Sequence, residues 1–425
     1  MKRNLFRVAL FSLVVVFSYC NSEGALPGNY LMAFHACDKS AYDCSQTTNH
    51  KIYLAYSEDG LTWTLVPNFT PFQGSVPDIV IRGNTLYFYT PDPDKVTKYN
   101  ISSGTTTSSL ISMTLSDGST DNLGDVSAYL DPTTNRISIF YLSTSNYPSN
   151  QDPQLCTTCT IRSATEVVGS DGVQFTVDDG DRVSSHFSDN NIFSDGTQYL
   201  LYFGQNANVT GSKSETLVYA SPTYKGTYTR LSSLTSGILT QSGSVPSGYY
   251  DKNTGKYWTY ITVLSPSSPA VIKRAVHADF SRQLTDSDFT TVMSGTIAGL
   301  GSNYTTESPD VILNTSSSIS HTLTAPSTTT VYRGETFGPI VSSITNGTSS
   351  SYSLNLYASV YTPKGSWVDT VTLQLTLPAG QTVINSNIMR YIPSFADAGT
   401  YYFCEYLYDT SWTQLDYKCI NFTVQ

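Results

Sequence analysis

Long hydrophobic runs and charged side chains are both scarce in this chain of 425 residues. Asp, Glu, Lys and Arg together account for 13% of it. Beyond an apolar run at residues 8–17, no stretch reaches the roughly 18 apolar residues that a membrane-spanning helix needs, so we expect no transmembrane segment. The formal net charge of −10 disfavours nucleic acid and anionic membranes as partners.

Several common catalytic motifs are also missing. No Gly-rich phosphate loop and no Gly-x-Ser-x-Gly elbow occur, which argues against nucleotide chemistry and against serine hydrolases of that type. Of the five histidines, only His186 lies close in sequence to a candidate site carboxylate, that of Asp189 three residues later. Tyr, Ser, Thr and Gly are abundant instead, and such surfaces suit sugars, although ordinary β-sheet composition would look similar.

The N-terminus predicts export. A basic start, Met1-Lys2-Arg3 with Arg7, precedes the apolar run, as in a secretory signal peptide, which we place at residues 1–24. We therefore expect an extracellular, secreted protein. Lipidation at Cys20 is the alternative, but Tyr19 fits poorly the small residue that such cleavage prefers.

The other six cysteines fall in three close pairs: Cys37 with Cys44, Cys156 with Cys159, and Cys404 with Cys419. In an oxidising compartment, local disulfides that pin loops are the simplest interpretation. Redox or half-zinc-site spacing is the alternative for the second pair. Seven Asn-X-Ser/Thr sequences are potential glycan sites, at residues 68, 100, 208, 303, 314, 346 and 421.

One pattern returns five times along the chain. A short apolar strand begins with a polar or acidic residue, and in the first four cases a turn and an aromatic strand follow, as in Asp189 to Phe193 before Tyr199 to Phe203. The pattern predicts an all-β, five-bladed β-propeller whose first strands line a central channel; a β-sandwich with similar hairpins is the alternative. The five segments are residues 76–81, 125–130, 189–193, 245–250 and 307–313.

The last segment lacks aromatic partners, whereas the N-terminal strands lack a first strand. Pairing residues 307–313 with residues 30–34, 51–56 and 63–66 makes one blade from both ends of the domain and removes exposed sheet edges. We therefore place the propeller at residues 25–314 and a polar linker at 315–320.

A second domain is expected at residues 321–425. Its strands have sandwich spacing, and Asp397 to Cys404 resembles the Asp-x-Gly-x-Tyr-x-Cys signature of immunoglobulin domains, with Tyr402 at the tyrosine-corner position. No cysteine lies between Glu335 and Ser343, so the usual bridge between the sheets is missing. We expect an immunoglobulin-like β-sandwich with a supporting or adhesive role.

Three motifs of the first domain resemble the five-bladed propellers of glycoside hydrolase family 43. Residues 57–63 are similar to a Ser-x-Asp-Gly-x-x-Trp turn, in which the Asp caps the turn and the Trp packs between blades. Residues 75–80 are similar to the Trp-Ala-Pro-Asp-Val strand, and residues 188–196 to the Asp-Pro-x-x-Phe-x-Asp-x-Gly blade. The resemblance covers about 285 residues in the same order.

The resemblance implies a base, a tuning Asp and a Glu acid around the channel. Asp78 matches the tuning Asp, but the strand that carries the base is missing and no Glu stands in the blade led by Val245. Glu307-Ser308-Pro309 looks like the acid motif, although it lies in the closing strand. Candidate catalytic residues are Asp78, Asp125 and Glu307, and candidate substrate-binding residues are Asp189, His186 and Asp310. Alternatively, these side chains only cap strand ends.

The leading hypothesis is a secreted propeller that hydrolyses a polysaccharide or its side chains by carboxylate acid–base catalysis. The alternative is a non-catalytic extracellular adhesion protein that binds a glycan in the channel or a protein through its outer faces or second domain. A purely structural surface protein is a third option. No cofactor is expected, although a channel cation such as calcium is conceivable.

Overall fold

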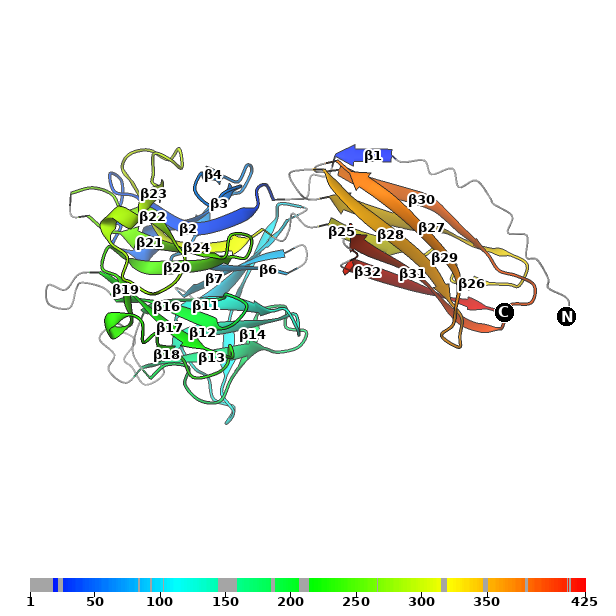
Figure 1. Cartoon of the computed structure of the whole chain (residues 1–425), viewed down its shortest axis with the longest axis horizontal. Coiled ribbons are helices and arrows are strands. Elements are labelled where there is room, and N and C mark those ends of the chain that lie inside the picture. The colour runs from blue at the N-terminus through cyan, green and yellow to red at the C-terminus, as the bar shows by residue number, and fades with distance from the viewer. Residues whose placement is uncertain are drawn as a thin grey trace. The chain divides into compact units, whose positions relative to one another are not determined.

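The computed structural model describes residues 18–21, 26–82, 85–91, 94–101, 103–143, 159–184, 188–205, 214–265, 267–314, 319–346, 351–378, 381–410, 412 and 414–425. The chain is nearly all β and divides into two compact units, residues 26–316 and residues 317–425 together with 1–25 (Figure 1). No helix in the described parts is long and apolar enough to cross a membrane.

The first unit is a β-propeller, as the sequence predicts. Its described strands form five sheets, in which neighbouring strands are antiparallel except for one parallel pair, and the innermost strands contact one another in a closed circle. These inner strands are β6 (Asp78–Arg82), β11 (Leu123–Asp131), β15 (Ser188–Ser194), β20 (Ser244–Asp251) and β24 (Tyr304–Leu313).

The remaining strands of each sheet follow its inner strand outward. β6 leads β7 (Thr85–Pro91), β8 (Asp94–Asn100) and β9 (Thr106–Leu110). β11 leads β12 (Arg136–Ser143), β13 (Thr160–Glu166), β14 (Gln174–Val177) and β10 (Ser112–Thr114). β15 leads β16 (Tyr199–Gln205), β17 (Glu215–Ser221), β18 (Thr229–Arg230) and β19 (Ile238–Thr240). β20 leads β21 (Lys256–Val263), β22 (Val271–His277) and β23 (Thr290–Met293).

The fifth sheet joins the two ends of the unit, which confirms the predicted closure. β24 pairs with β2 (Tyr30–Asp38), and β3 (Lys51–Ser57), β4 (Thr64–Leu65) and β5 (Phe72–Gln73) complete the sheet. Just after β24, the buried Asn314 amide donates hydrogen bonds to the carbonyls of Leu26, Pro27 and Gly28. Asn314 is one of the seven potential glycan sites, but its side chain is used for this closure; Asn346 is also buried.

The predicted turn at residues 57–63 has the expected structural role. One Asp59 carboxylate oxygen accepts the backbone N–H groups of Leu61 and Thr62, each at 2.8 Å. Trp63 is buried and packs edge-on against Tyr260 of the neighbouring sheet, with ring centroids 6.2 Å apart. The core of the unit therefore lies between adjacent sheets.

The second unit has two sheets. One contains β1 (Ser18–Asn21), β30 (Gln381–Tyr391), β27 (Thr336–Asn346) and β25 (Ile319–Thr324). The other contains β26 (Thr330–Val331), β32 (Gln414–Val424), β31 (Gly399–Asp409), β28 (Tyr352–Tyr361) and β29 (Trp367–Leu377). Phe337 and Phe422 stack across the two sheets at 4.2 Å.

One boundary differs from the expected one. β25 begins at Ile319, inside the segment 315–320 that we expected as a linker, because the alternation of apolar and polar residues already starts there. Most of the expected signal peptide lies outside the described residues, but Ser18–Asn21 pairs with β30. Cleavage after residue 24 would remove β1 from the mature protein.

The tyrosine-corner position belongs to Tyr401, so the prediction of Tyr402 is wrong. Tyr401 is 5% exposed and its hydroxyl donates to the Asp397 carbonyl at 3.1 Å, whereas Tyr402 is 45% exposed. Side chains alternate between the faces of a strand, so Phe403 rather than Cys404 points with Tyr401 into the core. A tyrosine corner is typical of immunoglobulin sandwiches, and the assignment of the unit to that class stays a prediction.

Two of the three predicted disulfides have both cysteines in the described residues, and both are present. Cys37 bonds Cys44, and Cys404 bonds Cys419 across β31 and β32. Cys159 is disulfide-bonded, and its predicted partner Cys156 lies outside the described residues.

Candidate functional site: the propeller channel

Within or just before each inner strand lies one residue in the left-handed backbone region. These residues are Val76, Asp125, Asp189, Val245 and Ser308, with φ between 40° and 53°, and we call them the bulge residues. The strand pairings of β11, β15, β20 and β24 shift register at this point, as a β-bulge requires.

Two residues after each bulge, one polar side chain per strand meets its neighbours around the channel axis. We call these five residues the axial ring: Asp78, Ser127, Asn191, Ser247 and Asp310. All five are buried, with exposed fractions of 6% or less. The repeating polar feature of the sequence is therefore this ring.

The axial ring is a closed circle of hydrogen bonds. Each ring side chain accepts a hydrogen bond from a backbone N–H on the next inner strand, and the donor is the residue just after the ring residue of that strand. Ile79 N–H donates to Asp310 at 2.7 Å, and Ala128 N–H donates to Asp78 at 2.7 Å. The circle continues from Ile192 N–H to Ser127 at 3.0 Å, Gly248 N–H to Asn191 at 2.8 Å and Val311 N–H to Ser247 at 3.1 Å. One such bond thus links every pair of neighbouring inner strands.

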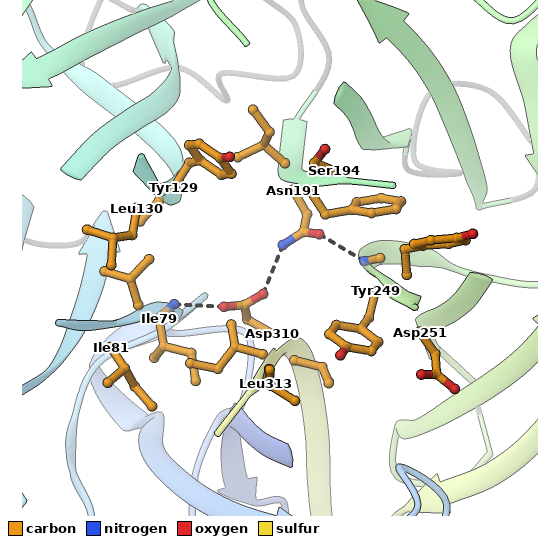
Figure 2. Close-up of a pocket in the computed structure, with 18 of the residues that line it drawn as sticks. Ile79, Ile81, Tyr129, Leu130, Asn191, Ser194, Tyr249, Asp251, Asp310 and Leu313 are labelled. Carbon is orange, nitrogen blue, oxygen red and sulfur yellow. Dashed lines mark hydrogen bonds between the residues drawn. The ribbon is translucent and has the colours of Figure 1, made fainter. Parts of the chain in front are cut away.

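Asn191 also links the two carboxylates of the axial ring. Its amide nitrogen donates to Asp310 at 2.9 Å (Figure 2). It also donates to Asp78 at 3.3 Å. The Ser247 hydroxyl donates to the same Asp310 oxygen at 3.3 Å. Both carboxyl groups are therefore held by donors from several strands.

Burial shifts the acidity of this pair. Desolvation raises the pKa of Asp310 to about 6, and desolvation together with the nearby Asp310 charge raises the pKa of Asp78 well above its usual range. A carboxylate loses its hydration on burial, so the neutral form is favoured. The ring thus retains protons at pH values where exposed Asp is ionised.

Asp125 and Asp189 occupy the bulge, two positions before the ring, so they are not equivalent to Asp78. The bulge inserts a residue, so acidic side chains are a poor anchor for aligning the inner strands. A better anchor lies four residues after four of the five ring positions, where Asp131, Asp195, Asp251 and Asn314 stand. Counting back from them gives Ser127 and Asn191, two ring residues that the sequence reasoning missed.

The other candidates lie on the strand-start side of the ring. Glu307 is half-buried and pairs with His35 in the register of β24 and β2; desolvation raises its pKa. His35 stacks on His50 at 4.2 Å and its Nδ1 accepts the Val76 N–H at 3.1 Å, so Nε2 carries the proton. His186 lies outside the described residues.

The ring separates two very different spaces. On the strand-start side, Asp78, Asp189 and Asp310 line a space of only about 20 Å³, enough for about one water molecule. Glu307 and Asp125 do not line it. Within the described parts of the chain, no cluster of three or more His, Cys, Asp or Glu side chains could hold a metal ion.

On the strand-end side, a cavity of about 520 Å³ opens along the inner strands (Figure 2). Asn191 and Asp310 form its floor. Its walls include Tyr129, Phe193 and Tyr249 and several aliphatic side chains, and the exposed Lys252 and Asn253 lie at its rim. A cavity of this size is in the usual range for a ligand.

No family model matches the chain, and no curated protein matches it. Among solved structures it is similar to an exo-β-1,3-galactanase from Phanerochaete chrysosporium solved with β-1,3-galactotriose, at 13% identity, covering 76% of this chain and 94% of that one, with a TM-score of 0.36. It is also similar to a family 43 arabinoxylan arabinofuranohydrolase from Bacillus subtilis in complex with cellotetraose, at 11% identity, 95% and 96% coverage and a TM-score of 0.40.

A third similar structure is an α-L-arabinofuranosidase from Lactobacillus brevis, at 8% identity, 84% and 91% coverage and a TM-score of 0.36. These structures include glycoside hydrolase family 43 enzymes, the family that the sequence motifs resemble. With TM-scores of 0.40 or less, the similarities carry no weight for the chemistry of the site.

Proposed function

We propose that the protein is an extracellular carbohydrate-active propeller that binds a neutral glycan in the 520 Å³ cavity. The observation that carries this proposal is the cavity itself, which combines half-buried tyrosine rings with polar groups of the strand edges. The disulfides of the described residues are compatible with an oxidising, extracellular location.

The strand edges supply the polar groups. Ile79 N–H points into the channel, because it binds Asp310 rather than β7. In an antiparallel pair, alternate residues direct both N–H and C=O away from the partner strand, so Ile81 shares this edge. The same alternation places Leu130, Ser194, Tyr250 and Leu313 on the channel edges of their own strands, and all five residues line the cavity. Sugar hydroxyls can form hydrogen bonds with these backbone N–H and C=O groups.

The aromatic side chains supply the apolar part. Tyr129 and Tyr249 are half-buried and line the cavity together with Phe193. Large rings favour burial against an apolar surface, and the apolar face of a sugar ring provides one. The charge of −10 favours a neutral glycan over an anionic one.

We assign Asp78 and Asp310 to closing the channel rather than to proton transfer. Both accept backbone N–H groups from neighbouring strands, and the space that they line with other described residues on the strand-start side has room for about one water molecule. This assignment favours binding over hydrolysis.

The test is glycan binding by the purified mature protein and by Leu313→Trp, with Leu110→Trp as the matched control. Leu313 is 48% exposed at the cavity, whereas Leu110 is 69% exposed on the outer strand β9. We expect Leu313→Trp to weaken binding at least tenfold and Leu110→Trp to leave it unchanged. Retention of full binding by Leu313→Trp would place the glycan elsewhere.

Hydrolysis is the second candidate, and Glu307 favours it. A half-buried Glu whose pKa is raised by desolvation has the property that a general acid needs. Asp125 and Asp189 are the base candidates on the same side of the ring, together with Asp78 from the ring itself.

A further inference from the structure

The cavity has two chemically different walls. The strands β15 and β20 contribute Phe193, Tyr249 and Tyr250, and Tyr129 of β11 lies beside them on the circle of strands. The aliphatic wall is formed by Ile79 and Ile81 of β6, Leu130 of β11, and Ile312 and Leu313 of β24. Ile79 and Ile81 are 1% and 7% exposed, so Leu130, Ile312 and Leu313 supply most of the accessible surface of this wall. Figure 2 shows Ile79, Ile81, Leu130 and Leu313 along one side of the space and Tyr249 across it.

The floor of the cavity offers no spare side-chain donor. Both Asn191 amide hydrogens are used by the two carboxyl groups, and its oxygen accepts the Gly248 N–H. Asp310 accepts hydrogen bonds at both oxygens. The side chains of the aliphatic wall cannot hydrogen-bond, so a hydroxyl pressed against these side chains, rather than directed at the backbone groups of the strand edges, would lose water without compensation.

We propose that the glycan places an apolar substituent against the aliphatic wall, namely the methyl group of a 6-deoxy or O-methylated sugar. This inference rests on the proposed function and adds the sugar class to it. Burying a methyl group against aliphatic side chains is favourable, and Leu313, which is 48% exposed, gains most from such a contact.

The polar groups of the other wall and of the rim favour a sugar over a wholly apolar ligand. Hydroxyls on the other side of the sugar ring reach the backbone groups of Ser194 and Tyr250, and those further out reach the exposed Asn253 and Lys252. A wholly apolar molecule would leave these polar groups without partners, at a cost in affinity.

The experiment is a glycan array with matched sets in which each hexose is present with a 6-hydroxyl, as the 6-deoxy sugar and as the 6-O-methyl ether. Wild type, Leu313→Asn and the control Leu110→Asn are compared on the same array, and dissociation constants are measured for the best set. We expect wild type and the control to prefer the apolar members roughly tenfold. Leu313→Asn, which gives the wall a polar partner, should lose most of this preference.

The outcomes separate the two proposals. Binding with equal or better affinity for the 6-hydroxyl members overturns the present inference and leaves glycan binding in place. A preference that survives in Leu313→Asn overturns the assignment to the aliphatic wall. No binding to any glycan, with thermal unfolding showing a folded protein, overturns the proposed function itself; retention of an apolar peptide instead would point to a protein partner.

Discussion

The two sides of the axial ring contrast sharply. On the strand-start side, acidic residues gather around about 20 Å³ of space; on the strand-end side, a cavity of about 520 Å³ has mostly uncharged walls. The acidic side suggests chemistry in the sequence, yet among the described residues the larger cavity lies on the other side.

The bulges explain this difference. Each one turns the start of an inner strand so that the ring side chain reaches the backbone of the next strand, which draws the five strands together at that level. Past the ring, no comparable set of side-chain bonds crosses the axis among the described residues, and the strands enclose a wider space. Polar residues that recur in a propeller can therefore close the channel rather than form a site.

The largest expected effect comes from breaking the ring on which this contrast depends. Asn191→Leu keeps the approximate side-chain volume but removes three hydrogen bonds and leaves two buried carboxyl groups and the Gly248 N–H short of partners. We expect a loss of about 3–6 kcal/mol in the free energy of unfolding, measured by chemical denaturation.

The control for this variant is Asn253→Leu, the same chemical change at an exposed turn residue. It should change stability by about 0.5 kcal/mol or less. Ser127→Ala, which removes one ring acceptor, should fall in between. Equal stability of Asn191→Leu and Asn253→Leu would show that the ring does not hold the propeller together.

The next effect concerns pH. The pKa of Asp310 is raised to about 6 in the folded protein, so the folded state keeps a proton that the unfolded chain loses near pH 4. The stabilisation is complete below about pH 4 and is lost as the pH rises through 6. For Asp310 alone this amounts to about 3 kcal/mol between pH 4 and 8.

His35 has the opposite sign, because burial and the neighbouring His50 lower its pKa and stability is then lost as the pH falls below about 6.5. The quantity to measure is therefore the stability of wild type minus that of Asp310→Asn at each pH. We expect this difference to fall steadily from pH 4 to pH 8. A difference that is constant or rises over this range would contradict the assignment of a retained proton to Asp310.

Much of the fold could be predicted because it follows from local patterns. Strand alternation, the Asp59 turn and the complementary ends of the first unit need only short-range signals and pairing rules, and the structure has all three. The ring residues Ser127 and Asn191 were missed because a bulge changes the alternation by one residue, and this shift is not visible when acidic residues are used as the anchor.

The same limit applies to Tyr402. Anchoring the motif on Cys404 placed the wrong tyrosine at the corner, whereas counting from Asp397 and Gly399 gives Tyr401. The cavity could not be predicted at all, because its walls are ordinary strand residues such as Ile81 and Leu313, whose pattern equals that of any core strand. Only the closure of the sheets around an axis makes them the walls of a cavity.

The smallest expected effect tests the acidic side directly. Glu307 precedes the ring on β24, whereas the cavity is lined by Asp310 and the residues after it. Glu307→Gln should therefore leave glycan affinity within about twofold of wild type, since it removes a charge on the far side of the ring and keeps the shape of the side chain. Glu58→Gln, at an exposed turn, is the matched control.

The same three proteins decide between binding and hydrolysis when they are assayed for sugar release from aryl glycosides and polysaccharides. If Glu307 is a general acid, its loss lowers turnover roughly 100-fold or more while Glu58→Gln is unaffected, and the strand-start side is then an active site despite its small space. If wild type binds glycan without releasing sugar and Glu307→Gln binds equally well, the acidic residues serve the fold, and the function resides in the cavity beyond the ring.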